Sequence, residues 1–187
     1  MAQVDDVQRD GLKRYYFLRA GVSVAWIIAA VAVGTGNPLA GGALLVAYPA
    51  WDALANALDA RSNGGFAANP PQTFNLIVSL LVACAVLFAL QTDPRRVLTV
   101  FGVWAAFAGL LQLVAGIRRW RSVGAQWPMA LSGAQSVLAG AFMITRSIQA
   151  GGHPPAPVEI APYAGFGAFY FLVAAIALTL KGRKAAG

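Results

Sequence analysis

The stretch "FGVWAAFAGLLQLVAGIRRW", residues 101–120, combines a long apolar run with glycines at a fixed spacing. No charged residue occurs from Val97 to Ile117, and a helix of about 20 such residues crosses the roughly 30 Å hydrocarbon layer of a bilayer. Gly102, Gly109 and Gly116 recur at every seventh residue, which is nearly two helical turns. The stretch therefore predicts a transmembrane helix with a stripe of glycine along one face.

The rest of the chain has the same character. Of its 187 residues, 58% are hydrophobic and 11% are charged, whereas a soluble domain carries about 25% charged residues. Backbone groups in lipid must be satisfied within a helix or a closed barrel, and runs this long favour helices. We therefore predict an all-α membrane protein with a single polytopic membrane domain over residues 1–187. Its six predicted spans are residues 17–34, 39–58, 73–90, 97–117, 128–144 and 163–180.

Basic residues between the spans predict the orientation of the chain. Eleven lie on one side of the predicted membrane: Arg9, Lys13, Arg14, Arg19, Arg61, Arg118, Arg119, Arg121, Lys181, Arg183 and Lys184. Three lie on the other side: Arg95, Arg96 and Arg146. Because cytoplasmic loops are enriched in Lys and Arg, both termini are expected in the cytoplasm. The six spans then form three hairpins of equal orientation, that is, a parallel repeat.

Glycine spacing also predicts which helices pack together. Gly133 and Gly140 repeat the seven-residue spacing in span five. Small residues allow helix backbones to approach closely in lipid, so spans four and five are expected to form a tight pair. A glycine-lined pore is the alternative interpretation of the same stripe. Such faces also allow association of the chain into homo-oligomers.

These glycine-spaced helices, "FGVWAAFAGLLQLVAGIRRW" and "LSGAQSVLAGAFMI", resemble the HdeD-like group of bacterial inner-membrane proteins. The resemblance implies a protein of short two-helix repeats whose function is largely unknown. The name of the group is associated with acid resistance, and the group offers no catalytic residues. The first third of this chain departs from the group's general pattern.

That departure centres on "YPAWDALANALDAR", residues 48–61, in span two. Asp52, Asn56 and Asp59 follow the spacing i, i+4, i+7 and so share one helix face. Asp59 is expected at the cytoplasmic interface and Asp52 about 10 Å deeper, where a charge costs about 2.5 to 3.5 kcal/mol. Counting equal distances back from the turn after span one brings Arg19 level with this face. We therefore predict an intramembrane polar cluster of Arg19, Asp52, Asn56 and Asp59, in which Arg19 meets Asp52 and Asn56 completes the contact.

Two interpretations of this cluster compete. In the first, a buried ion pair holds spans one and two together. In the second, Asp52 accepts protons or coordinates a substrate in a cavity open to the cytoplasm. Pro49 adds a third possibility, because a break at that proline would leave residues 51–61 as an amphipathic segment lying on the membrane.

The sequence lacks recognisable catalytic patterns. There is no nucleophile–base arrangement, phosphate-binding loop or dinucleotide fingerprint. A single cysteine and a single histidine exclude a disulfide within the chain and leave little for a metal site. The basic residues that give the net charge of +7 lie in short clusters between the spans, as topology requires, so no nucleic acid is expected as a partner. No cofactor is expected either. We therefore predict a non-catalytic inner-membrane protein acting in stress or acid tolerance or in membrane organisation. A transporter or channel for a small solute or proton, with a cytoplasm-facing cavity around Asp52, is the alternative.

Overall fold

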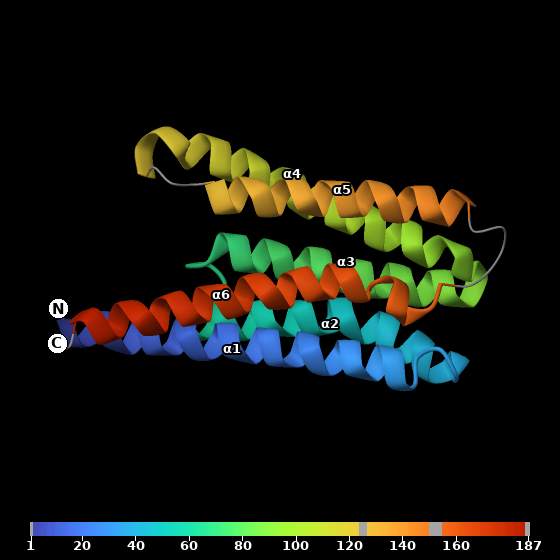
Figure 1. Ribbon diagram of the computed structural model, residues 1–187, viewed down its shortest axis with the longest axis horizontal. Coiled ribbons are helices and arrows are strands. Elements are labelled where there is room, and N and C mark those ends of the chain that lie inside the picture. Colours follow the sequence, from blue (N-terminus) through green and yellow to red (C-terminus); the bar gives the residue numbers. More distant parts are fainter. Residues whose placement is uncertain (1, 124–126, 150–154, 186–187) are drawn as a thin grey trace. The chain divides into compact units, whose positions relative to one another are not determined.

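The computed structural model describes residues 2–123, 127–149 and 155–185, and the side chains within residues 10–114, 130–149 and 155–180. Each predicted span falls on a separate helix, so the all-α prediction is confirmed, although α1 begins well before the predicted residue 17, at Ala2 (Figure 1). The surroundings of Gly116, and the basic residues at positions 118–121 and 181–184, lie outside the described side chains. The helices are α1 (Ala2–Ala32), α2 (Pro38–Ser62), α3 (Pro70–Thr92), α4 (Val97–Val123), α5 (Trp127–Gln149) and α6 (Ala161–Ala185), with short 3-10 turns η1 (Pro94–Arg96) and η2 (Pro157–Glu159).

Four segments are long and apolar enough to cross a membrane. Among the described residues these are Asp10–Ala32, Pro70–Thr92, Pro94–Val114 and Ala161–Leu180. The protein is therefore a multi-pass membrane protein. Helices α2 and α5 fall outside this group, and in α2 the polar residues Asp52 and Asn56 lower the apolar character. A crossing by α2 and α5 stays a prediction.

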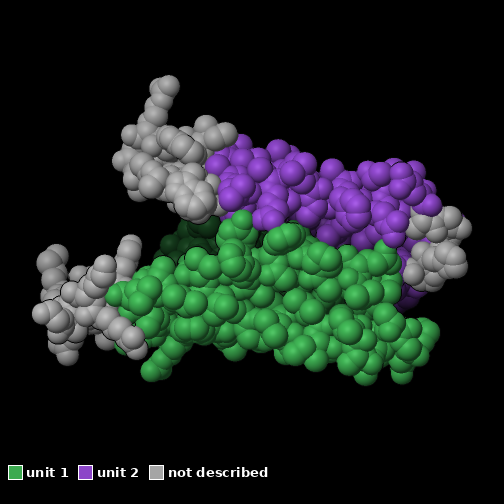
Figure 2. Space-filling model, viewed as in Figure 1, with its two compact units in different colours: residues 1–77, 156–187 green, residues 78–155 purple. Residues whose placement is uncertain are grey.

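The chain divides into two compact units, coloured separately in Figure 2. Unit 1 consists of residues 1–77 and 156–187, which include α1, α2, the first part of α3, and α6. Unit 2 consists of residues 78–155, which include the rest of α3 together with α4 and α5.

In unit 1 the closest helix pair is α1 with α6, and α2 packs less closely against α1. Ala20 on α1 and Ala164 and Ala168 on α6 are buried, and their small side chains allow the two helices to approach. Helix α1 begins and α6 ends at the same end of this unit (Figure 1). The pairing of α1 with α6, from opposite ends of the chain, was not among the sequence predictions.

Helix α2 begins sharply after a tight turn. Asn37 is its N-cap, and the Asn37 side chain accepts hydrogen bonds from the amides of Leu39 (3.0 Å) and Ala40 (3.1 Å). Pro38 occupies the first helical position, where its missing N–H costs nothing. A β-carbon at Gly41 would lie 2.7 Å from the carbonyl oxygen of Gly34, so only glycine allows the two helix ends to meet this closely.

Pro49 does not break α2, which is helical throughout Pro38–Ser62. The proline leaves the carbonyl of Leu45 without its usual helical donor, and the ring of Pro49 is fully buried. One residue away, the indole nitrogen of Trp26 on α1 donates to the carbonyl of Leu44 at 2.8 Å. The Trp26 and Tyr48 rings also pack with centroids 4.8 Å apart. The break at Pro49 that the amphipathic-segment interpretation requires is therefore absent from α2.

Unit 2 is built on the pairing of α4 with α5, the most extensive helix–helix contact in the described chain. Helix α4 follows η1, whose N-cap Asp93 accepts a hydrogen bond from the amide of Arg95 at 3.3 Å. Phe101 and Ala105 on α4 are fully buried.

Candidate functional site

The first candidate site is a cluster around Arg19 in unit 1. Arg19 lies on α1 and Asp52 on α2, and Nη2 of Arg19 donates to Oδ1 of Asp52. The side chains of Arg19 and Asp52 are 14% and 20% exposed, so the ion pair is largely removed from its surroundings. A pair in such a place needs further hydrogen bonds to offset the loss of solvation of both charges.

Asn56 supplies one of those hydrogen bonds. It lies one helical turn beyond Asp52, and its side-chain nitrogen donates to Oδ2 of Asp52 at 3.1 Å and to the Asp52 carbonyl at 2.8 Å. Asn56 is buried. Both carboxylate oxygens of Asp52 therefore accept a hydrogen bond from within unit 1.

Tyr15 and Phe171 complete the surroundings of the guanidinium group. Nη1 of Arg19 donates to the hydroxyl oxygen of Tyr15 at 3.0 Å. The guanidinium carbon lies 4.3 Å from the centroid of the Phe171 ring on α6, which is a close cation–π contact. The Nε atom of Arg19 is buried and has no hydrogen-bond partner among the described residues. Arg19 thus contacts side chains on α1, α2 and α6.

Asp59 takes its hydrogen bond from the end of α2. Its Oδ1 accepts a hydrogen bond from the side chain of Asn63 at 2.9 Å, and Asn63 is the C-cap of α2. The structure thus brings together Arg19, Asp52 and Asn56, the first three of the four residues that the sequence placed in the polar cluster, and leaves Asp59 at the helix end.

Sequence reasoning missed Tyr15 and Phe171. Tyr15 precedes Arg19 by one helical turn, so the i, i+4 spacing is a signal that was present in the sequence. Phe171 carries no such signal, because its position over Arg19 depends on α6 lying against α1.

The second candidate site is the glycine seam of unit 2. A β-carbon built on Gly109 would lie 2.5 Å from the carbonyl oxygen of Gly133, and one built on Gly133 would lie 2.8 Å from that of Gly109. For Gly102 and Gly140 the corresponding distances are 2.7 and 2.5 Å. The two helices thus cross in contact at two reciprocal glycine pairs, where dispersion and weak Cα–H···O bonds hold them.

A hydroxyl clasp closes one end of the α4–α5 pair. The Ser147 hydroxyl on α5 donates to the carbonyl of Arg95 at 2.8 Å and accepts from the Thr99 hydroxyl at 2.7 Å. Nearby, Nε of Arg95 donates to Asp93 at 2.8 Å. This hydrogen bond and the Arg95 charge hold the pKa of Asp93 below its ordinary value.

Neither site has the composition of a metal centre. Among the described residues, no three metal-ligating side chains gather in one place. The polar cluster combines one cation, one anion, an amide and a phenol, a set suited to ion pairing and hydrogen bonding.

Comparison with known proteins places unit 2 in a wider context. Residues 77–145 match the model of a family described as a short repeat of unknown function, DUF308. This is the family to which HdeD belongs, and the match includes both reciprocal glycine pairs. No curated protein and no solved structure matches the chain.

Proposed function

We propose that the protein is a non-catalytic, multi-pass inner-membrane protein of the HdeD-like kind, acting in membrane organisation or in stress tolerance, including acid tolerance. The observation that carries this proposal is the use of polar groups in unit 1. The Arg19–Asp52 pair joins α1 to α2, Asn56 occupies the second carboxylate oxygen, and Phe171 of α6 covers the guanidinium. Groups engaged in this way act as a pin between helices.

The proposed arrangement has six membrane crossings and both termini in the cytoplasm. Its support is the distribution of basic residues, eleven against three, and the fact that α1 begins and α6 ends at one end of unit 1. The glycine faces of α4 and α5 are directed at each other within the chain. A homo-oligomer would therefore use other surfaces than these.

A transporter or channel for protons or a small solute is the second candidate. It is favoured by one observation: the ion pair is not fully enclosed, since the Asp52 side chain is 20% exposed. A carboxylate held at such depth in a membrane commonly belongs to an ion or proton path.

One variant pair separates the two functions. Asp52→Asn keeps the shape of the side chain but removes the charge, and Asp59→Asn makes the same change at the helix end as a matched control. Proton and solute flux are measured in vesicles containing each purified variant, and the helical fold is checked by circular dichroism. The scaffold function predicts no flux with the native chain or either variant. Flux that Asp52→Asn abolishes and Asp59→Asn retains would establish transport instead.

The physiological part of the proposal needs a cellular test. A bacterial strain lacking the gene is exposed to acid, and survival is compared after return of the native gene, Asp59→Asn or the glycine-seam variant Gly109→Leu. We expect the first two genes to restore survival and Gly109→Leu to fail, because the methylene groups of leucine cannot fit between α4 and α5. Equal survival of all strains, including the one without the gene, would contradict a role in acid tolerance.

A further inference from the structure

An open groove runs along the outside of the α1–α6 pair in unit 1. Nine residues line it, and nearly all of its exposed surface is apolar: Phe17, Ala20, Gly21, Val24, Ile27, Gly165, Ala168, Phe169 and Leu172. Alanine and glycine form the hollow, because their side chains leave the space that larger residues would fill. The aromatic rings of Phe17 and Phe169 are 43% and 58% exposed.

The groove has the length of one lipid tail within one leaflet. On α1 it extends from Phe17 to Ile27, a rise of about 15 Å along the helix at 1.5 Å per residue. Half of a hydrocarbon layer of about 30 Å is the same length. An acyl chain that enters at the Phe17 end would therefore end near the middle of the bilayer.

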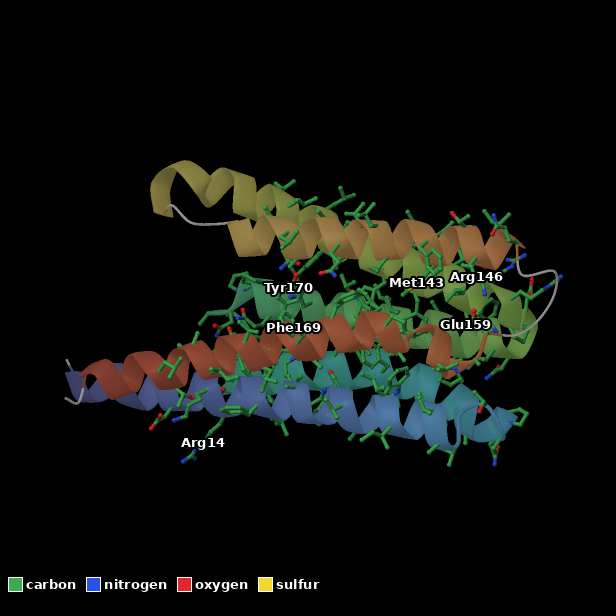
Figure 3. The ribbon with its side chains drawn as sticks, in the orientation of Figure 1. Arg14, Met143, Arg146, Glu159, Phe169 and Tyr170 are labelled. Atoms are coloured by element: carbon green, nitrogen blue, oxygen red, sulfur yellow. The ribbon has the colours of Figure 1, made fainter. Side chains whose placement is uncertain are left out.

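Two basic residues on α1 precede the Phe17 end of the groove. Lys13 is one turn before Phe17 and in line with Ala20, and Arg14 is in line with Gly21. Arg14 is exposed and extends away from α1 (Figure 3). Lys13 contacts Asp10 at 2.7 Å, but Asp10 is 63% exposed, and such surface pairs contribute little. Both cations are therefore available to an anion at headgroup depth.

We propose that this groove is a binding site for an anionic phospholipid, with one acyl chain between α1 and α6 and the phosphate at Lys13 and Arg14. The charge complementarity at its mouth distinguishes the groove from the remainder of the apolar helix surface. The occupant combines two features, a chain of leaflet length and a negative headgroup, and each feature meets its own part of the site. This inference is independent of whether the protein is a scaffold or a transporter.

The test compares two lipids with identical chains. The full-length protein in detergent is titrated with dioleoyl-phosphatidylglycerol or dioleoyl-phosphatidylcholine, and bound lipid is counted by native mass spectrometry. Each basic residue near an anionic headgroup contributes about fivefold in affinity, so the native chain should prefer phosphatidylglycerol by about 25-fold. Lys13→Gln combined with Arg14→Gln should bring that preference close to one. Equal binding of both lipids by the native chain would overturn the proposal.

Groove-filling variants test the acyl chain. Gly21 has no atom within 4 Å of an added β-carbon, and at Gly165 the nearest is Ile27 Cδ1 at 3.9 Å, so a side chain can begin at both positions without a clash at its β-carbon. The double variant Gly21→Leu, Gly165→Leu should bind both lipids with about tenfold lower affinity, which is the loss expected for about two methylene contacts. Gly11→Leu, on another face of α1 with equal space, is the control and should bind as the native chain does. Lipid binding by the Gly21→Leu, Gly165→Leu variant that equals that of the native chain would contradict a lipid site. So would a native chain that is a dimer without bound lipid, if this variant is a monomer, because the groove would then hold a second copy of the chain.

Discussion

Replacing Gly109 by alanine places a methyl group where α4 and α5 leave no room for one. The new carbon would meet the Gly133 carbonyl oxygen at 2.5 Å and the Val137 amide nitrogen at 2.7 Å, and both of these are backbone atoms that no side-chain rotation can move. Ordinary contact begins at 3.4 Å, so the helices must separate by about 0.9 Å (3.4 minus 2.5) at this crossing. Overpacking of this kind costs typically 1 to 3 kcal/mol.

Gly21→Ala is the matched control, because an added β-carbon there meets nothing within 4 Å. Alanine favours helix over glycine by about 0.5 to 1 kcal/mol at either position, so this gain cancels between the two variants. We expect Gly109→Ala to unfold with a free energy about 2 kcal/mol lower than that of Gly21→Ala. The measurement is equilibrium unfolding in mixed micelles with a rising fraction of sodium dodecyl sulfate. If Gly109→Ala is as stable as Gly21→Ala, the glycine seam does not determine the packing of α4 and α5.

Two further predictions concern charged groups. Arg19→Met should lower the free energy of unfolding by about 3 kcal/mol because it leaves Asp52 buried without its cation. Adding Asp52→Leu should recover most of that loss. A double variant whose loss equals the sum of the losses of the two single variants would refute the Arg19–Asp52 contact between α1 and α2. Asp93 has a lowered pKa in the folded chain, so its contribution is present above the unfolded-state pKa of about 3.9 and disappears as the pH falls through the lower folded-state value. Asp93→Asn should therefore unfold more easily than the native chain at pH 6 but equally at low pH, and an advantage of the native chain that persists at low pH would contradict this assignment.

The elements that local periodicity specifies were accessible from the sequence. A seven-residue glycine spacing defines one face of a helix, and Gly109 and Gly133 do meet at such a face. The meeting of Arg19 with Asp52 follows from the shortness of the turn at Asn37, because antiparallel helices joined by few residues have a fixed register. These inferences need only the helix rise and the position of a turn.

Contacts between distant parts of the chain were not accessible in this way. Nothing in the pattern around Phe171 identifies the cation that it covers, because many aromatic residues in an apolar helix have the same local surroundings. The sequence also does not identify the partners of Ser147 and Thr99, since a hydroxyl in a helix usually donates to the backbone of its own helix. Asp59 shows the opposite failure: its spacing matches the cluster face, but the helix end supplies Asn63 as a nearer partner.

The glycine seam has a consequence for how unit 2 reaches its alignment. Sliding α5 along α4 by seven residues would set Gly140 against Gly109 and Gly133 against Gly116, which again matches two pairs. The glycines alone therefore allow two equivalent registers of α5 along α4. Only in the observed alignment does the Ser147 hydroxyl reach the Arg95 carbonyl. The hydrogen bond of the Ser147 side chain thus distinguishes two registers that the glycine spacing does not distinguish.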